Sequence, residues 1–512
     1  MSRTLVILEV SRKQDYIFSS KRLRENAARS EEIRFVTSSP FFQEASDQYR
    51  EDANLVYSGG GHTILQFDDA VQATEFTKQV TEKALRQFDS MEIYAKQLEY
   101  DSTLSPGDNL KKLSAALEAK KSLRRQSFRL LNFGVEELDG ETFAPVRIDS
   151  LPEDKRHSRP EAVRAPDGWE FPVQLEDVAG GDNFIAVVHI DGNAMGKRVE
   201  GLYAKSSNDW ELCKASLQQF SDGIDADFKA AFEETVNELV DKYWKEGKNP
   251  KLPIRPIILA GDDVCFVTAG NIGIECARVF LNHLASKTNQ EDGMPYAACA
   301  GVAIVHQKYP FHRAYTLSEE LCSSAKRFGA SIDPDGRISA MDWHIEFGQL
   351  KDSLSDIRDD YETNDSSDND CKRLELRPVV VLQPDGVPKE RAAEQTGGVR
   401  TYSFFRAMSL AMKEEQNQIA RGKIKDLREA FKQGEIESNF FMQDRQIGNL
   451  LYHGFSAEHA GNEVSAAYNL LKGGATEIDK SAFRKICGIK RCIFFDAIEL
   501  LDHCDFWEGA NT

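Results

Sequence analysis

Residues 254–267 read Ile-Arg-Pro-Ile-Ile-Leu-Ala-Gly-Asp-Asp-Val-Cys-Phe-Val, in which two apolar runs flank a polar turn. The runs Pro256–Leu259 and Val264–Val267 are too short for helices and are rich in β-branched residues, so they predict two buried strands. Gly261 permits a sharp turn between them. The stretch therefore predicts a β-hairpin that carries two adjacent carboxylates, Asp262 and Asp263, at its tip.

Neighbouring carboxylates on a rigid hairpin repel each other unless a cation lies between them. Hard divalent cations bind such oxygen atoms, so Asp262 and Asp263 are candidate metal ligands. The alternative is an ordinary hairpin loop, because Gly and Asp are common turn residues in proteins without any ligand. The metal interpretation therefore needs support from other parts of the chain.

Length and composition indicate a globular protein. The chain has 512 residues, which predicts two to four domains with an ample core. Its net charge of −19 repels phosphate backbones and argues against broad nonspecific binding of nucleic acid. No window approaches about 18 uninterrupted apolar residues, so we expect a soluble, cytoplasmic protein with no membrane contact. Nine scattered cysteines without a Cys-x-x-Cys pair favour reduced thiols.

A loose group near the end of the chain contains Cys487, Cys492, His503 and Cys504. Its spacing is not that of a standard zinc module, and the surrounding pattern is helical. We therefore expect these cysteines to be small buried residues, with zinc ligation as the alternative.

Two parts of the chain share one order of elements. The first part begins with a predicted strand at 4–10, has a helix-like stretch through Phe35, and continues with a hairpin (54–57 and 63–67) and a helix at 69–88. The second part has a strand at 183–192, a long helix at 210–243, the 254–267 hairpin and a helix at 271–286. The order strand, helix, hairpin, helix therefore occurs twice.

The two copies differ in their chemistry. The first strand of the second copy ends on Asp191, whereas the equivalent strand of the first copy carries Glu9. The turn Gly261-Asp262-Asp263 corresponds to a turn of glycines followed by His62 in the first copy. Only the second copy is therefore predicted to hold two metal ions.

A carboxylate at the end of one strand and a carboxylate pair at the adjacent hairpin suit two-metal nucleotidyl transfer. The candidate catalytic and metal-binding residues are Asp191, Asp262 and Asp263, with the backbone carbonyl of Ile190 as a further ligand. Residues that leave room for a nucleotide or supply charge for its phosphates are Gly192, Gly196, Lys197, Arg198, Gly261 and Lys326. For the cations among them, a solvated surface position or a helix end is the alternative. His189 is expected to be a packed histidine and not a ligand.

At these positions the chain resembles the large polymerase-like subunit of type III CRISPR effector complexes, the cyclic oligoadenylate synthase family. The resemblance lies in His189–Lys197, in the Ala-Gly-Asp-Asp hairpin, and in Ala300–Pro310 followed by Ser324-Ala-Lys326. It extends to Gln14–Ser30, Gly59–Gly61, Leu376–Pro378 and the helical tail, so it covers most of the chain.

The resemblance implies an α+β fold with two ferredoxin-like palm domains, which are nucleotide cyclase or polymerase domains, and a C-terminal α-helical domain. The expected boundaries are a first, degenerate palm with a helical insertion at 1–150, a connection at 151–180, a second, catalytic palm at 181–400 and the helical domain at 401–512. The acidic segment 352–370 is expected to be a disordered loop inside the second palm.

The resemblance also implies that ATP binds between the palms and is converted to cyclic oligoadenylate second messengers of antiviral defence with Mg²⁺ or Mn²⁺. Gly59, Gly60, Gly61 and His62 would then line the neighbouring nucleotide pocket. The implied partners are ATP and other effector subunits with guide RNA and target RNA, and a homodimer is an option if the chain acts alone.

Some features depart from the family pattern. Ala260 replaces the first glycine of the usual Gly-Gly-Asp-Asp, and no His-Asp pair occurs near the N-terminus, so we expect a compact form without the HD nuclease domain. Two alternatives stay open. One is a dinucleotide cyclase of the Gly-Gly-Asp-Glu-Phe type, which would use GTP and pair two identical subunits. The other is a catalytically silent scaffold that binds nucleotide or partner subunits.

Overall fold

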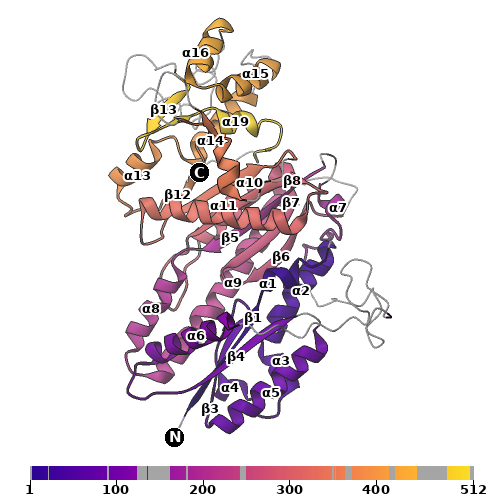
Figure 1. Cartoon of the computed structure of the whole chain (residues 1–512), viewed down its shortest axis with the longest axis vertical. Helices are drawn as coiled ribbons and strands as arrows, with labels where there is room; N and C mark the ends of the chain where they lie inside the picture. The colour runs from indigo at the N-terminus through magenta and orange to yellow at the C-terminus, as the bar shows by residue number, and fades with distance from the viewer. Residues whose placement is uncertain are drawn as a thin grey trace.

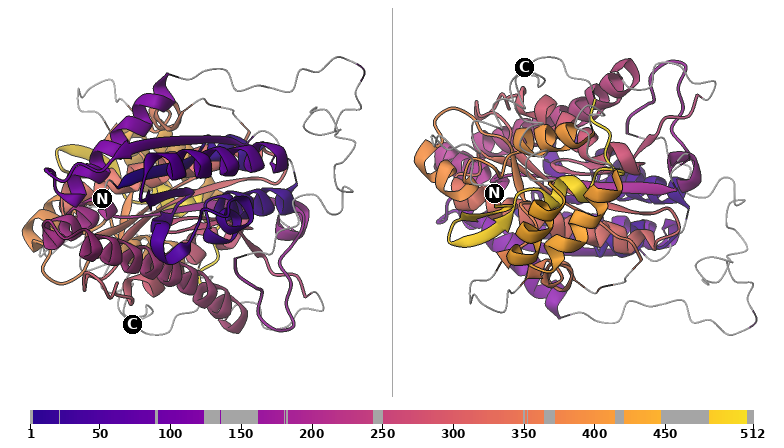
Figure 2. Two further views of the ribbon diagram at one scale, coloured as in Figure 1. Left: turned by 90° about the horizontal axis from the view of Figure 1, so that it is seen from below. Right: turned by 90° about the horizontal axis from the view of Figure 1, so that it is seen from above.

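The computed structural model describes residues 3–20, 22–88, 91–123, 135, 162–179, 181, 183–242, 250–348, 351, 353–363, 372–413, 421–446 and 481–507. These residues build β-sheets that follow one another along the longest axis, with the N-terminal sheet at one end and the C-terminal elements at the other (Figure 1). Seen from below, the N-terminal elements lie in front of the middle sheet (Figure 2). Within the described ranges, no helix combines the length and the apolar character that a membrane crossing requires.

The first sheet is antiparallel and has the strand order β2-β3-β1-β4. Its strands are β1 (Thr4–Ser11), β2 (Leu55–Gly59), β3 (His62–Phe67) and β4 (Glu92–Glu99). The accompanying helices are α1 (Lys13–Ile17), α2 (Leu23–Val36), α3 (Ser39–Ala45), α4 (Glu51–Asn54), α5 (Ala70–Gln87) and α6 (Pro106–Ser122). We call this part the first unit. The predicted first strand, hairpin and following helix are confirmed.

The second sheet has the strand order β12-β9-β8-β5-β7-β6. Its strands are β5 (Phe184–Gly192), β6 (Ile254–Ala260), β7 (Asp263–Ala269), β8 (Ala298–His306), β9 (Ser339–Ile345) and β12 (Val379–Leu382). The helices are α7 (Leu175–Ala179), α8 (Met195–Ser206), α9 (Trp210–Lys242), the short 3₁₀ helix η3 (Gly270–Ile272), α10 (Gly273–Ala285) and α11 (Phe311–Ile332). We call β5–β8 with these helices the second unit. The 254–267 hairpin is confirmed as β6 and β7.

The two units have the same topology. The order β2-β3-β1-β4 in the first unit corresponds strand for strand to β6-β7-β5-β8 in the second. The registers agree as well, because Glu9 pairs with His62 where Asp191 pairs with Asp263. The predicted duplication of an α+β, ferredoxin-like unit is therefore confirmed by connectivity and by register.

The second sheet is covered on both faces. Helices α9 and α10 bury one face through aromatic contacts, such as Phe232 against Phe266 at 5.5 Å and Phe228 against Phe280 at 6.3 Å. Helix α11 covers the other face, where Gly301 lets the helix backbone approach so closely that a Cβ would lie 2.0 Å from a carbonyl oxygen. Alternating residues of β5 therefore point to opposite layers, and Asp191 lies on the α11 side.

The two units pack against each other in a reciprocal way. Helix α9 of the second unit lies on β2 of the first, and α2 of the first unit lies on β6 of the second. Ser221 on α9 donates a hydrogen bond to the Ser58 carbonyl at 2.9 Å. The hairpin tips meet, because the Cβ position of Gly261 is 4.0 Å from the backbone nitrogen of Gly60. Both hairpin turns therefore belong to one interface.

The C-terminal part contains helices and a small sheet. The helices are α13 (Lys389–Thr396), α14 (Tyr402–Lys413), α15 (Arg421–Lys432), α16 (Glu435–Asp444) and α19 (Phe495–Glu499). The sheet has the order β10-β11-β14-β13 and consists of β10 (Glu362–Thr363), β11 (Lys372–Arg373), β13 (Phe483–Ile486) and β14 (Ile489–Cys492). The helical pattern predicted beyond Tyr402 is thus interrupted by a hairpin, whose turn at Gly488 has a positive φ of 81°.

The acidic segment 352–370 is partly ordered, contrary to the prediction. Its first half forms α12 (Leu354–Asp359), where the Ser353 hydroxyl caps the helix by accepting from the Asp356 backbone N–H at 3.2 Å. Leu354 and Ile357 are buried, so this half has enough apolar contact to fold. Residues 364–370 lie outside the described residues.

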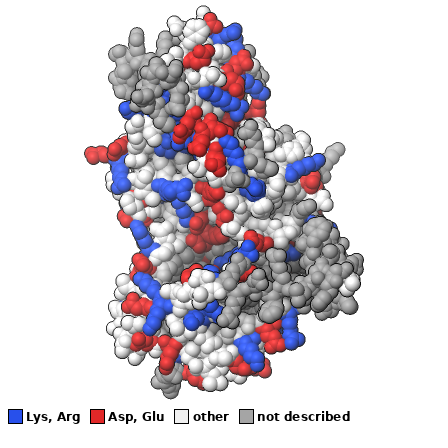
Figure 3. Space-filling view, in the orientation of Figure 1, with Lys and Arg blue, Asp and Glu red and all other residues white. Residues whose placement is uncertain are grey.

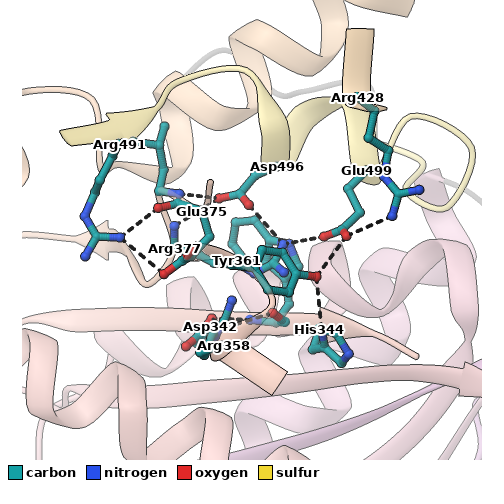
Figure 4. Close-up of polar contacts among 12 residues, drawn as sticks. Asp342, His344, Arg358, Tyr361, Glu375, Arg377, Arg428, Arg491, Asp496 and Glu499 are labelled. Carbon is teal, nitrogen blue, oxygen red and sulfur yellow. Dashed lines mark hydrogen bonds and ion pairs between the residues drawn. The ribbon is translucent and has the colours of Figure 1, made fainter. Parts of the chain in front are cut away.

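A buried ionic network joins the C-terminal elements to the second sheet (Figure 4). Arg377, whose side chain is fully buried, donates to Asp496 at 3.0 Å and to Glu499 at 2.8 Å. Tyr361 donates to Glu499 at 2.9 Å, and Asp496 also accepts the backbone N–H of Arg377. Although burial opposes ionisation, Arg377 lowers the pKa of Glu499 to about 2. The charged groups of this network therefore hold α19 against the second sheet, on the side where β9 lies.

Replacing Arg377 by Met should destabilise the fold strongly, because Asp496 and Glu499 would stay buried without their partner. We expect a loss of about 3–5 kcal/mol in the free energy of unfolding, measured by chemical denaturation. The control is Arg86→Ala, which removes an exposed pair with Glu82 and should cost less than about 1 kcal/mol. Equal losses for the two variants would contradict a structural role for the network.

Candidate functional site

The predicted carboxylates gather at one end of the second sheet. Asp191, the last residue but one of β5, lies directly opposite Asp263, which begins β7. The side chain of Asp262 covers Gly192, where an added Cβ would lie 2.9 Å from the Asp262 Cβ and 3.1 Å from its Oδ2. Gly261 turns the chain with a positive φ of 65°. Strand register and a tight turn thus bring Asp191, Asp262 and Asp263 to one place.

The pKa values of Asp262 and Asp263 are raised. Burial, and next the charge of Asp191, raise the pKa of Asp262 to about 6 and that of Asp263 to about 7. The positive charge of Lys326 lowers both values in part. Negative charge at this edge is therefore incompletely compensated by the protein itself, which is the electrostatic condition that favours a bound cation.

Lys326 lies at the centre of this charge distribution. Its Nζ donates to Asp191 Oδ2 at 2.5 Å and to the Gly192 carbonyl at 2.9 Å. Burial opposes its charge, but Asp191 outweighs that effect and raises the pKa of Lys326. The first unit has an equivalent pair, in which Lys121 on α6 contacts Glu9 on β1 at 2.9 Å. A lysine paired with the acid of the first strand is thus a feature of both units.

The residues fit a divalent cation in charge and donor type, with two restrictions. Within the described residues, no group of three or more His, Cys, Asp or Glu side chains is arranged to hold a metal ion. One oxygen of Asp191 is bound by Lys326, so a cation at that oxygen must compete with an ammonium group. Asp263 Oδ1 is buried and has no hydrogen-bond partner in the described part of the chain. Ile190 is fully buried, and its carbonyl as a ligand stays a prediction.

The predicted residues of the first unit lie across the interface from these carboxylates. Gly60 and Gly61 have positive φ values of 57° and 76°, so the turn needs glycine. Gly59 packs under Ser221 Oγ and the Tyr57 hydroxyl. The ring of His62 lies 4.9 Å from that of Tyr57, and burial, followed by the charge of Lys13, lowers the pKa of His62 to about 4.

A cavity of about 390 Å³ opens beside this turn. It is lined by residues 9–15 and Lys121, which bring both cations and carboxylates. Lys13 donates to the Gly60 carbonyl, and the charge of Asp263 also acts on Lys13. Lys13 therefore lies between the cavity and the second unit. In the view of Figure 3, acidic side chains gather across the middle of the molecule, with lysines and arginines around them.

Residues 196–198 lie at the start of α8, where Lys197 and Arg198 bind partners other than the predicted carboxylates. Arg198 is buried and forms a bidentate pair with Asp292 at 2.6 and 2.8 Å, so its predicted role as a phosphate ligand is wrong. Its guanidinium also stacks on Tyr296 at 4.9 Å. Lys197 donates to the Pro334 carbonyl at 2.6 Å, and the Cβ position of Gly196 is open. Both residues stay predictions as nucleotide contacts.

The C-terminal cysteines are mostly buried, as expected. Cys492 and Cys504 are buried and Cys487 is exposed, where its thiol donates to the Glu394 carbonyl at 3.2 Å.

Sequence reasoning missed Lys13, Tyr57, Lys121 and Glu319 as neighbours of the site. Lys121 could have been predicted from the sequence, because aligning the two units on their strands makes it equivalent to Lys326. Lys13 and Tyr57 carry no such signal, since they approach the carboxylates only through the contact between the units.

The raised pKa of Asp263 gives a testable pH dependence. Because the folded state holds this proton more tightly than the unfolded state, its contribution stabilises the protein below the unfolded pKa and is lost as the pH rises through about 7. In EDTA, the thermal stability of Asp263→Asn should therefore fall less than that of the wild type as the pH rises from about 5 to about 8. The exposed control Asp385→Asn should follow the wild-type curve in thermal unfolding. Parallel curves for wild type and Asp263→Asn would contradict the electrostatic account.

The Lys326 ammonium should compete with metal ions at Asp191. We expect Lys326→Met to bind Mn²⁺ at least roughly fivefold more tightly, the equivalent of about 1 kcal/mol, in calorimetric titrations without nucleotide. Lys121→Met is the matched control, because it removes the equivalent ammonium from Glu9 in the first unit. It should leave Mn²⁺ affinity unchanged. Weaker binding by Lys326→Met would show that the lysine supports the metal site instead of competing with it.

Several solved structures and one family model are similar to this chain. Solved structures similar to this chain include a Csm1–Csm4 cassette in complex with cA3 (15% identity, TM-score 0.45, 66% of this chain and 54% of that chain). They also include the Csm1–Csm4 subcomplex of the type III-A CRISPR-Csm interference complex (17% identity, TM-score 0.45, 66% and 54%). The chain thus spans about half the length of these matched chains. No curated protein matches.

A family model matches residues 184–331, which comprise β5 to α11 and contain Asp191, Asp262, Asp263 and Lys326. The family is described as Cas10/Cmr2, second palm domain. Over these residues the resemblance expected from the sequence is therefore confirmed, because residues 184–331 match the second palm domain of the Cas10/Cmr2 family.

Proposed function

We propose that this chain is a metal-dependent nucleotidyltransferase that converts ATP into cyclic oligoadenylates in CRISPR-type antiviral defence. The observation that carries the proposal is an asymmetry between two units of equal topology whose hairpin tips meet. Only the second unit has acids at all three equivalent positions, Asp191, Asp262 and Asp263. This unit matches the second palm family. Packing alone does not require a pair of acids whose pKa values are raised by burial and by the charge of a third acid.

Mg²⁺ or Mn²⁺ would be held by Asp191, Asp262 and Asp263, with the Ile190 carbonyl as a further ligand. When bound, the ions would lower the pKa of an attacking ribose hydroxyl and neutralise the triphosphate and its leaving group.

The chain's own residues would bind and orient the nucleotide at the interface of the units. Gly60 and Gly261, which are partly exposed where the hairpin tips meet, would leave backbone open to a close-lying ligand, whereas Gly61 and Gly192 are buried. Lys13 and Lys121 bring positive charge to the cavity on the side of the first unit. His62, whose pKa is lowered to about 4, would be neutral and able to accept a hydrogen bond or stack. These groups would hold two nucleotides in a fixed relative orientation, which is a large part of catalysis of phosphoryl transfer.

The proposal extends to organisation and partners. We propose palms at 1–150 and 181–400, a connection at 151–180 and a mainly helical domain at 401–512. Other effector subunits with guide RNA and target RNA are the proposed partners, and a homodimer is the proposed form if the chain acts alone.

A nucleotide-binding scaffold is the second candidate. It is favoured by the contact of Lys326 with Asp191 and by the lack of a three-donor metal group within the described residues. A GTP-using dinucleotide cyclase shares the same carboxylates and differs in base preference.

Replacing Asp262 and Asp263 by Ala should reduce ATP turnover by at least roughly a thousandfold, because the negative charge that holds the metal is removed. The measurement is mass spectrometry of products after incubation with ATP and Mn²⁺, with and without target RNA and the partner subunits. Asp385→Ala, an exposed acid, is the control with unchanged turnover. Products from the doubly substituted chain would contradict the proposal, absence of product from the wild type under all conditions would favour the scaffold, and preferential use of GTP would favour the dinucleotide cyclase.

A further inference from the structure

His189 lies behind the carboxylate of Asp263. It occupies β5 two residues before Asp191, so both side chains point to the α11 face of the sheet. His189 is buried, with 6% of its surface exposed. A buried imidazole beside an acidic site is a polar group whose partner must be identified.

Two unsatisfied atoms face each other at this position. His189 Nδ1 lies 3.7 Å from Asp263 Oδ1. Both atoms are buried, and neither has a hydrogen-bond partner in the described part of the chain. The Asp263 side chain as a whole is 47% exposed, so its accessible surface belongs to the rest of the carboxylate, including Oδ2. One oxygen is thus directed inward to the histidine while the other side of the group is open.

The separation is close to that of a hydrogen bond. A shift of about 0.8 Å would give an ordinary N–H···O distance. The inward oxygen has a reason to make this shift, because a buried carboxylate oxygen without a donor is energetically costly. A histidine that donates to a ligating carboxylate fixes the direction of its other oxygen and is a common way to support a metal ligand.

The imidazole is held in place by α11 and by the first unit. Its ring meets Tyr315 edge to face, at 5.6 Å and 87°. Tyr315 donates to Glu319 at 3.1 Å, and Gln14 on α1 of the first unit donates to the same Glu319 at 2.5 Å. Phe18, just after α1, packs on Tyr315 at 4.3 Å. The position of His189 therefore depends on contacts that cross the interface.

The first unit lacks this arrangement. By strand register, Ile7 takes the place of His189, and His62 takes the place of Asp263. The histidine behind the hairpin thus occurs only in the unit that has a carboxylate for it to orient.

We propose that His189 is a positioning residue that donates from Nδ1 to Oδ1 of Asp263 and thereby directs Oδ2 of Asp263 toward a divalent cation. The inference rests on the proposed function, because it presupposes that Asp263 is a metal ligand. It assigns to His189 a role distinct from that of a packed core residue.

The test compares Mn²⁺ affinity, measured by electron paramagnetic resonance of free Mn²⁺, in variants of the complete chain. His189→Leu removes the donor and should weaken Mn²⁺ binding about tenfold. His189→Asn places an amide N–H near the position of Nδ1 and should restore most of the affinity. His344→Leu is the matched control, because His344 is a buried histidine of the same sheet. It contacts Tyr361 and not the candidate metal ligands. The control variant should leave Mn²⁺ affinity unchanged even if it lowers the melting temperature.

Unchanged affinity in His189→Leu, or equal weakening in the Leu and Asn variants, would overturn the proposal. If the Leu variant does not fold, His189→Asn is compared with His189→Gln, whose amide reaches a different position. Near-wild-type Mn²⁺ affinity in the Asn variant and weak Mn²⁺ binding in the Gln variant support the proposal. Equal Mn²⁺ affinities in the two variants overturn it. Asp263→Ala distinguishes a failure of the metal site from a failure of the role of His189. Retained Mn²⁺ affinity in Asp263→Ala overturns the metal site itself, whereas its loss together with full affinity in His189→Leu overturns only the role of His189.

Discussion

Compensation of negative charge at the tip of the β6–β7 hairpin is the constraint on which the site depends. Asp191, Asp262 and Asp263 are brought together by strand register and by a turn at Gly261, and the pKa values of the latter two acids rise as a result. Among these three acids, Lys326 forms an ion pair with Asp191, and it also donates to the Gly192 carbonyl. A folded protein keeps such a strained arrangement only where another requirement outweighs its cost in stability. Under the proposed function, a bound divalent cation would meet that requirement.

Duplication explains which part of this arrangement is architectural and which part is chemical. Both units have an acid on the first strand paired with a lysine on the helix that follows the fourth strand, Glu9 with Lys121 and Asp191 with Lys326. This pair therefore belongs to the common framework. The units differ at the hairpin, where Gly61 and His62 stand in place of Asp262 and Asp263. The same backbone thus presents a neutral, glycine-rich turn on one side of the interface and a charged turn on the other.

The sequence was informative wherever local pattern determines structure. Short β-branched runs and Gly261 predicted the hairpin, and the repeated order of elements predicted two units of one topology. It was misleading where a partner lies far away in the chain. Arg198 follows a lysine near a glycine, as a phosphate ligand would, but Asp292 binds it within the core. The hairpin β13–β14 was hidden inside a helical pattern because β11, more than a hundred residues earlier, provides its neighbouring strand. Lys13 approaches the site only through the packing of the units, which no local pattern encodes.

The contacts of α1 link the interface between the units to the carboxylates. Gln14 and Phe18 of the first unit hold Glu319 and Tyr315, and Tyr315 in turn packs against His189 beside Asp263. Lys13, on the same short helix, binds the turn of the first unit at Gly60. Helix α1 therefore contacts the hairpin turn of the first unit directly, and it is linked to the hairpin of the second unit through side chains of α11. Because interiors are closely packed, a ligand that separates or tightens the two units must also displace these side chains. Under the proposed function, binding at the interface and the orientation of Asp263 would consequently be coupled, and the first unit would be part of the site although it lacks the carboxylate pair of the second hairpin.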